Sequence, residues 1–307
     1  MANSSAAAFR SLGPAARRRH GASARLLLHG RQSPVCPQVN LSAPQAFCSA
    51  HSARSLAAAM TSPTPDSPTQ GIGNNLIRAL KPADRRQIED LLEPWEGQTG
   101  AILYEPGDIV SYAYFPCDKA LASFRVVLAD GRSAETALIG REGAIGGIVS
   151  EGRLPAYARA IVQFPGTFHR IALSDLSRLK SSSVSLYNLF ARYADCLLAQ
   201  IFQATACNAA HSIEQRSAKW LLAAIDRTGE REVSLTQEQL AGLLGIGRSY
   251  MSRVVQRMKA EHIIATRRGR LVVRDSDALA RISCDCNDLV RAHFDEVLRG
   301  VYPTADD

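Results

Sequence analysis

The sequence contains no run of roughly 18 or more apolar residues, the length that a helix needs to cross a bilayer. It also contains no Cys-x-x-Cys pair, and its seven cysteines are scattered along the chain. An odd number of scattered cysteines fits a reduced cytosolic protein better than a disulfide framework. We therefore expect a soluble, cytoplasmic protein that has no membrane partner.

Motifs that carry catalysis or bind metals are missing as well. There is no recognisable Ser/His/Asp arrangement, Gly-Lys phosphate loop, pair of catalytic carboxylates or His-Glu metal motif. Cys284 and Cys286 form the one closely spaced cysteine pair, and His293 completes no recognised spacing with them. Because structural zinc usually takes four ligands, this pair alone is weak support for a metal. The sequence predicts neither an enzyme nor a metal site.

Acidic residues are nearly absent from residues 1–70, which hold seven arginines and one acid, Asp66. This segment is rich in Ala, Ser and Pro and has no sustained periodicity, so we interpret it as a disordered tail. Arg-rich, acid-poor beginnings are also typical of organellar transit peptides. Translation from an upstream start codon is the simpler explanation, because Met60 opens a natural short leader, and residues 1–59 would then lie outside the native protein. The tail carries most of the formal net charge of +7, so that charge says little about nucleic-acid binding.

The rest of the chain shows strand-like and then helical patterns. Apolar residues from Asn74 onward indicate two short helical pieces interrupted at Pro82. Residues 97–172 contain short alternating or β-branched runs broken by Gly and Pro turns, a pattern that favours a β-sandwich or jelly roll. We expect this β-domain to act as a sensor.

From about Ser174 the apolar residues return to a helical period. One stripe has the spacing of a coiled-coil seam and comprises Leu186, Phe190, Tyr193, Leu197, Ile201 and Ala204. The alternative is a helix that packs on its own β-domain. A second apolar stripe consists of Leu189, Ala194, Leu198 and Phe202. With two stripes, one face of the helix can pack on the β-domain and the other on a partner helix, which favours a homodimer. A further amphipathic helix follows over residues 211–227 and is expected to end at Gly229.

Residues 236–261 carry the pattern of two helices joined by a tight turn. Thr236 and Gln239 have the spacing of a capping box, which predicts the start of the first helix. Gly245 and Gly247 allow the positive φ of a tight turn, and Ile246 between them supplies an apolar contact between the helices. The inward face of the first helix is Leu240, Leu243 and Leu244.

The second helix of this pair, over residues 248–261, has two distinct faces. Its apolar face is Met251, Val254, Val255 and Met258, and its polar face is Arg248, Ser249, Ser252, Arg253 and Gln256. Side chains near the N-terminus of a recognition helix reach base edges in the major groove. We therefore assign base readout to Arg248, Ser249, Ser252 and Arg253. The alternative is an ordinary solvated helix face.

The residues that follow favour DNA binding over a solvated face. Strand-like runs at 263–266 and 271–274 flank Arg267-Arg268-Gly269-Arg270, which predicts a β-hairpin with an arginine tip. A helix-turn-helix followed by a basic hairpin is a winged helix, whose arginines fit backbone phosphates. Residues 234–274 hold eight basic residues against two acids. We expect contacts to the backbone of double-stranded DNA from Thr236, Tyr250, Arg267, Arg268 and Arg270.

Five motifs occur in a shared order over residues 74–299, and on them the chain resembles the Crp/Fnr family of bacterial transcriptional regulators. They are YEPGD, YFP, GREG, HSIEQRSAKWLL and LTQEQLAGLLGIGRSYMSRVV. The resemblance implies a cyclic-nucleotide-binding-like β-roll, a long dimerisation helix and a winged helix. It also implies RNA polymerase and a small-molecule effector as partners.

Together these patterns predict an α+β fold in three parts after the tail. A jelly-roll-like β-domain covers residues 71–173, a dimerisation helix covers 174–210, and a winged helix-turn-helix domain covers 211–299. The predicted function is sequence-specific control of transcription in response to an unidentified signal. The alternative is a ligand-sensing or protein-interaction module whose helix-turn-helix is structural.

Three departures from the family pattern bear on ligands and specificity. Gly143-Ala144-Ile145-Gly146 lacks the glutamate that would hold a ribose, and Arg159 is displaced by one residue from the phosphate-binding position, which on a strand reverses its direction. Gly143, Gly146 and Arg159 thus remain weak effector candidates, and cyclic nucleotide is disfavoured. An iron-sulfur cluster is also disfavoured, since only Cys36 and Cys48 lie near the N-terminus, so we predict no cofactor. Ser249 stands where many relatives carry a glutamate, which should change the preferred site.

Overall fold

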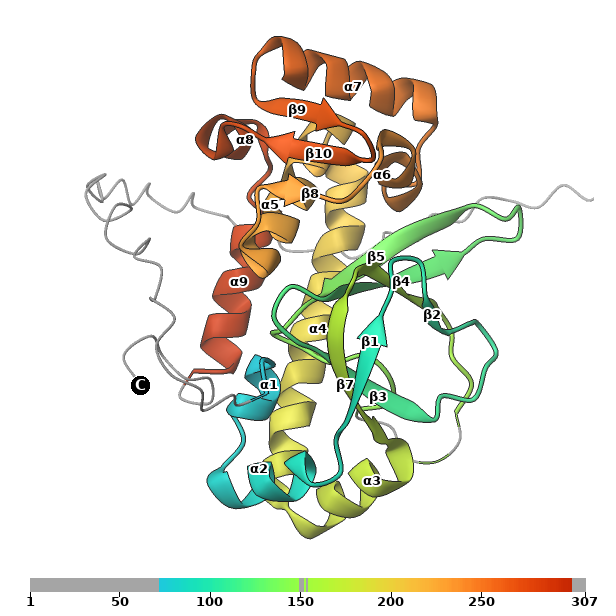
Figure 1. Ribbon diagram of the computed structural model, residues 1–307, viewed down its shortest axis with the longest axis vertical. Coiled ribbons are helices and arrows are strands. Elements are labelled where there is room, and N and C mark those ends of the chain that lie inside the picture. Colours follow the sequence, from blue (N-terminus) through green and yellow to red (C-terminus); the bar gives the residue numbers. More distant parts are fainter. Residues whose placement is uncertain (1–71, 149–151, 153, 300–307) are drawn as a thin grey trace, which may run out of the picture. The chain divides into compact units, whose positions relative to one another are not determined.

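The computed structural model describes residues 72–148, 152 and 154–299 (Figure 1). The predicted tail, residues 1–70, lies outside the described residues. The described chain opens with two short helices, α1 (Asn75–Arg78) and α2 (Pro82–Glu89). Pro82 starts α2 rather than interrupting a helix, because a proline at the first helical position loses no helical hydrogen bond. Asn74 fixes α1 to the β-domain, since its side-chain amide donates to the carbonyl oxygens of Pro116 and Gly143.

The β-domain consists of two antiparallel sheets. The first has the order β1-β7-β3, formed by β1 (Glu93–Gly97), β7 (Gly166–Ala172) and β3 (Tyr112–Pro116). The second has the order β2-β6-β4-β5, formed by β2 (Ile102–Tyr104), β6 (Arg159–Phe164), β4 (Leu121–Val127) and β5 (Ser133–Ile139). The first strand pairs with the last, as in a jelly roll, which confirms the predicted fold class.

Two helices follow where the sequence predicted one. Helix α3 (Leu173–Ser182) ends at Ser183, and the hydroxyl of Ser183 accepts the Leu186 N–H to cap α4 (Val184–Ala210). The predicted seam of α4 packs largely on the chain's own β-domain: Leu186, Phe190 and Tyr193 share a core with Phe115 and Ile171. This stripe therefore covers the chain's own β-domain, and the homodimer stays a prediction.

The C-terminal part has a three-stranded sheet among five helices. Its elements are α5 (Ile213–Thr228), β8 (Glu232–Val233), α6 (Gln237–Leu243), α7 (Arg248–Ala260), β9 (Ile264–Arg267), β10 (Arg270–Val273), α8 (Ser276–Ile282) and α9 (Cys286–Val297). Helix α5 ends at Gly229 in the left-handed region, with φ of 71°, as predicted. Strand β8 adds to β10 at the edge of the hairpin and was not predicted.

Helix α5 joins the β-domain to the winged helix. Leu121, Leu138 and Phe164 of the β-domain belong to the same apolar core as Trp220 of α5 and the helices of the winged domain. The indole Nε1 of Trp220 donates to Glu135 on β5 at 2.6 Å. Helix α9 runs back along α4 (Figure 1), where Phe294 packs edge-on against Tyr193. None of the helices described is long and apolar enough to span a bilayer.

Candidate nucleic-acid interface

The helix-turn-helix begins with the capping box that the sequence predicts. The Thr236 hydroxyl accepts the Gln239 N–H at 3.1 Å, and the Gln239 side chain accepts the Thr236 N–H at 2.8 Å. Gly245 has φ of 68°, which only glycine adopts without strain, and Ile246 packs against the core of the winged domain. These features hold α6 and α7 at a fixed angle.

Helix α7 separates its two faces as predicted. Met251, Val254, Val255 and Met258 are buried. Of the predicted base-reading residues, Arg248, Ser249 and Arg253 are exposed and Ser252 is half-buried. Helix α7 begins after Gly247, which supplies no side-chain cap, so the first N–H groups of the helix remain available to a phosphate or a base. The polar face therefore starts at the N-terminus of α7, the end at which a recognition helix reaches base edges.

The predicted DNA-binding residues on α7 make only weak contacts within the chain. Arg248 lies 3.6 Å from Glu238, and both side chains are more than two-thirds exposed. Such a surface pair contributes little stability and can be exchanged for a phosphate. The guanidinium of Arg253 lies over the Tyr250 ring, 5.2 Å from its centroid, a weak cation–π contact at an exposed site.

The wing has a narrower basic tip than predicted. Arg267 and Arg270 are strand residues that pair with Glu232 on β8, at 3.3 Å and 2.7 Å. Arg268 and Gly269 form the two-residue turn, with φ of 72° at the glycine. Within the described residues, Arg268 is the exposed wing arginine without an ion pair. The hydrogen bond from Arg270 lowers the pKa of Glu232, so this acid stays ionised beside the wing.

Sequence reasoning missed two contacts that shape the interface. Glu232 lies on a two-residue strand that is too short for a periodic signal. Arg216 on α5 donates to the carbonyl oxygen of Leu244 at 3.0 Å, where α6 ends. In the sequence, Arg216 is one of several polar residues of an ordinary amphipathic helix. The contacts of Glu232 with the wing arginines and of Arg216 with Leu244 join residues far apart in the sequence, so no local sequence pattern predicts them.

The three weak effector candidates each have a structural role. A Cβ atom at Gly143 would lie 2.1 Å from the Tyr193 hydroxyl, and one at Gly146 would lie 2.4 Å from the Tyr112 carbonyl oxygen. Arg159 pairs with Glu105 at 2.7 Å. Packing and pairing therefore explain these three residues without a bound ligand.

The β-domain also contains a cavity of about 300 Å³ that involves other residues. Its lining comprises Leu103, Tyr104, Asp108, Ile109, Val110, Ser111, Tyr112 and Tyr114. No basic side chain is among these lining residues, so the cavity offers little to a phosphate group.

A helix-turn-helix with an exposed polar face, a basic hairpin and a jelly-roll domain are joined through a long helix, and together they define the fold. Residues 215–282 match the Crp-like helix-turn-helix domain. The chain has the fold of Crp/Fnr-type transcription regulators with a helix-turn-helix DNA-binding domain, which confirms the resemblance drawn from the sequence.

Several solved structures share this fold at low sequence identity. FixK2 from Bradyrhizobium japonicum is 16% identical, with a TM-score of 0.54 over 63% of this chain and 98% of that one. The c-di-GMP-responsive global regulator CLP from Xanthomonas campestris is 15% identical, with a TM-score of 0.53 over 63% of this chain and 99% of that one. A CRP-family transcriptional regulator from Thermus thermophilus is 19% identical, with a TM-score of 0.53 over 62% and 96%. No curated protein sequence matches the chain.

Proposed function

We propose that this protein is a homodimeric regulator that binds specific operator sequences and controls transcription. The observation that carries the proposal is the polar face of α7, which begins at the helix N-terminus and lies beside the basic wing. A recognition helix presents its first turns to base edges in the major groove. The wing supplies a positive charge where the DNA backbone would pass.

The proposal gives the candidate DNA-contacting residues two kinds of role. Base readout is assigned to Arg248, Ser249, Ser252 and Arg253, and backbone contacts to Thr236, Tyr250, Arg267, Arg268 and Arg270. Arg253 is the strongest candidate for a bidentate contact to guanine, because its guanidinium is exposed and lies over the Tyr250 ring. Arg267 and Arg270 would have to exchange Glu232 for a phosphate, so Arg268 is expected to contribute most from the wing.

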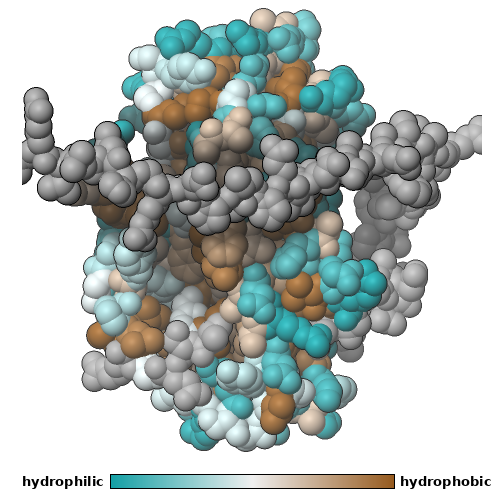
Figure 2. All heavy atoms as spheres, turned by 180° about the vertical axis from the view of Figure 1, so that it is seen from behind, coloured by the Kyte–Doolittle hydropathy of each residue, from teal (hydrophilic) through white to brown (hydrophobic). Residues whose placement is uncertain are grey.

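The proposed dimer uses the exposed apolar residues of α4. Leu198 is 45% exposed and Phe202, one turn further on, is 65% exposed. Apolar side chains gather in the middle of the molecule when it is seen from behind (Figure 2). Pairing α4 with the α4 of a second copy would cover these residues and present two recognition helices to half-sites roughly 34 Å apart.

The proposed signal acts on the β-domain and reaches the winged helix through α5. The shared core and the hydrogen bond from Trp220 to Glu135 provide a physical connection. We do not assign cyclic nucleotide as the effector, because its candidate residues Gly143, Gly146 and Arg159 are used in packing and pairing. RNA polymerase remains the expected protein partner, and the cytoplasm the expected location.

Selection of bound genomic fragments by the purified full-length chain tests this function. We expect enrichment of sequences with two related half-sites, and an affinity for these sequences that falls steeply with salt. Failure to enrich any sequence at low salt would contradict the proposal. It would support the alternative, a sensing or interaction module whose helix-turn-helix is structural.

A further inference from the structure

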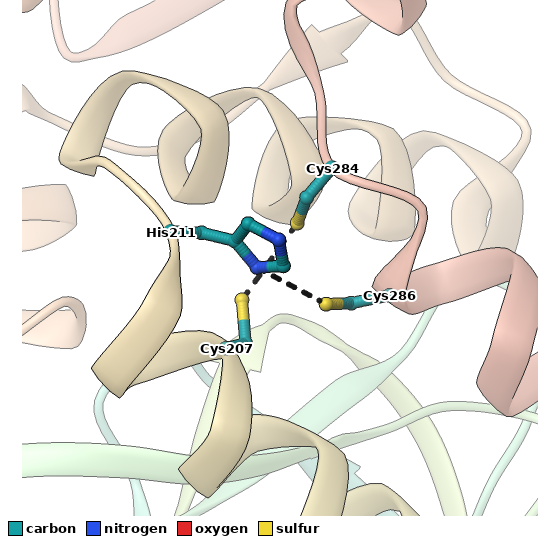
Figure 3. Close-up of side chains that lie close together, drawn as sticks. All are labelled: Cys207, His211, Cys284 and Cys286. Carbon is teal, nitrogen blue, oxygen red and sulfur yellow. Dashed lines mark hydrogen bonds between the residues drawn. The ribbon is translucent and has the colours of Figure 1, made fainter. Parts of the chain in front are cut away.

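Four metal-ligating side chains from two distant parts of the chain converge at the end of α4 (Figure 3). Cys207 lies in the last turn of α4, and His211 is the residue that ends this helix. Cys284 lies between α8 and α9, and Cys286 is the first residue of α9. The three cysteines are buried and the histidine is half-buried, and their four ligand atoms all lie within 4.8 Å of one another.

The Cys207–Cys284 and Cys286–His211 distances match edges of a tetrahedron around one zinc ion. Zinc binds thiolate sulfur at about 2.3 Å and imidazole nitrogen at about 2.0 Å, which gives edges of about 3.8 Å between two sulfurs and about 3.5 Å between sulfur and nitrogen. The Sγ atoms of Cys207 and Cys284 lie 3.7 Å apart. The Sγ of Cys286 lies 3.5 Å from Nδ1 of His211.

We propose that Cys207, His211, Cys284 and Cys286 bind one Zn²⁺ ion in a structural site. Four protein ligands complete the coordination of zinc and leave no position open for a substrate. Thiolate and imidazole ligands favour zinc over magnesium or calcium, which take oxygen ligands. In an iron-sulfur cluster the four ligands are divided among two or more iron atoms, and ligands on different irons stand farther apart. All four atoms here lie within 4.8 Å of one another, which favours a single metal ion.

The surroundings of the cluster suit a bound metal with thiolate ligands. The Gln203 side chain donates a hydrogen bond to Sγ of Cys286 at 3.2 Å, a contact of the kind that orients a metal ligand. Zinc with three thiolates and a neutral histidine carries a net negative charge. Arg216 interacts electrostatically with Cys207 and Cys284 and can offset this charge.

The position of the site gives the metal a mechanical role, and this part of the inference rests on the proposed function. Only His211 and Ser212 connect α4 to α5. A metal bound here ties the end of α4 to the α8–α9 connection, and so fixes the winged helix on the dimerisation helix. Arg216 extends the connection to the helix-turn-helix through its hydrogen bond to Leu244. Loss of zinc should therefore weaken operator binding as well.

The test measures metal content and cobalt spectra on the full-length chain, so it does not depend on DNA. The protein is purified under reducing conditions and its zinc and iron are quantified. Apoprotein is then titrated with Co²⁺, whose visible spectrum reports tetrahedral geometry and thiolate ligands. The variants are Cys284→Ala, His211→Cys and the matched control Cys117→Ala. Cys117 is also buried beside a histidine, with Sγ 3.2 Å from Nδ1 of His169, but among the described residues it belongs to no group of three or more potential ligands.

We expect one zinc ion per unchanged chain and a tetrahedral thiolate-cobalt spectrum. Cys117→Ala should keep the metal, Cys284→Ala should lose it, and His211→Cys should keep it with a shifted cobalt spectrum. An unchanged chain that retains no zinc and gives no thiolate-cobalt absorption would overturn the proposal, as would stoichiometric iron and sulfide. Should Cys284→Ala not fold, the unchanged chain and His211→Cys still decide it. A zinc-loaded chain that binds no operator would contradict the proposed function alone.

Discussion

Glu135 is a titratable residue at the junction between the β-domain and the winged helix. It lies on β5 and accepts a hydrogen bond from Trp220 on α5. Burial raises the pKa of Glu135 from its usual 4.5 to about 7. Between these two values the unfolded chain releases the proton while the folded chain keeps it. The contribution of this group to stability is therefore present below pH 4.5 and is lost as the pH rises toward 7.

We predict that Glu135→Gln removes this pH dependence. Glutamine stays neutral and still offers Trp220 an acceptor, so the variant should exceed the unchanged chain in stability at pH 8 by on the order of 2 kcal/mol. At pH 4.5 the two proteins should unfold at similar denaturant concentrations. Urea unfolding at both pH values measures the difference. Parallel pH profiles for the two proteins would show that Glu135 is ionised without cost.

At the level of single residues, local patterns predicted the geometry of the helix-turn-helix and missed the ion pairs of the wing. The polar face of α7 and the capping box at Thr236 follow from spacing along one helix, and the structure reproduces both geometries. The ion pairs of Glu232 with Arg267 and Arg270 depend on strand pairing across the sheet. Sequence spacing carries no information about such a contact, so the basic tip was predicted too wide.

The turn between α6 and α7 is the element whose geometry most depends on one residue. Gly245 has φ of 68°, and a Cβ there would meet Ala134 at an ordinary contact distance of 3.6 Å. We predict that Gly245→Ala destabilises the protein by about 1–2 kcal/mol through backbone strain alone. Thermal unfolding measures the loss.

Gly242→Ala is the matched control for this prediction. Gly242 lies within α6, and a Cβ there would have no neighbour within 4 Å. Alanine favours a helix by about 0.5–1 kcal/mol relative to glycine, so this variant should be slightly more stable than the unchanged chain. Equal effects of the two substitutions would mean that the turn does not need a positive φ.

At the scale of elements, the sequence predicted long periodic segments well and short ones poorly. Gly229 marked the end of α5 because the contacts that end a helix are local. The break between α3 and α4 at Ser183 and the two-residue strand β8 are too short to produce a periodic pattern of apolar residues. The apolar stripe of α4 was visible, but periodicity does not say which surface covers a stripe. Much of it packs on the β-domain, and Leu198 and Phe202 remain exposed.

Dimerisation belongs to the scale of the whole molecule. We predict that Phe202→Glu weakens the dimer by at least tenfold, because it removes apolar contact and places like charges opposite one another across a two-fold axis. Sedimentation velocity over a concentration series measures the change. Tyr157→Glu is the control, since Tyr157 is 84% exposed but lies outside α4. A Phe202→Glu protein that stays dimeric at the same concentrations would place the interface elsewhere.

Contacts between distant segments set the limit of what the sequence could predict for the whole molecule. Cys284 and Cys286 were recognised as a pair, but Cys207 lies 77 residues before Cys284 and adjoins it only in the folded chain. The bond between Glu135 and Trp220 spans 85 residues in the same way. The order of the domains was predictable because each carries its own pattern, whereas the junctions between them were not.

Operator titration with Arg253→Ala and Arg268→Ala tests the central claim most directly. Arg253→Ala should lose roughly 10- to 100-fold in affinity for the selected operator and relax preference at one base position. Arg268→Ala should weaken binding to all sequences alike and reduce the salt slope by about one. Arg281→Ala on α8 controls for the loss of a charge. Unchanged affinity and sequence preference in both interface variants would contradict DNA readout by α7 and the wing.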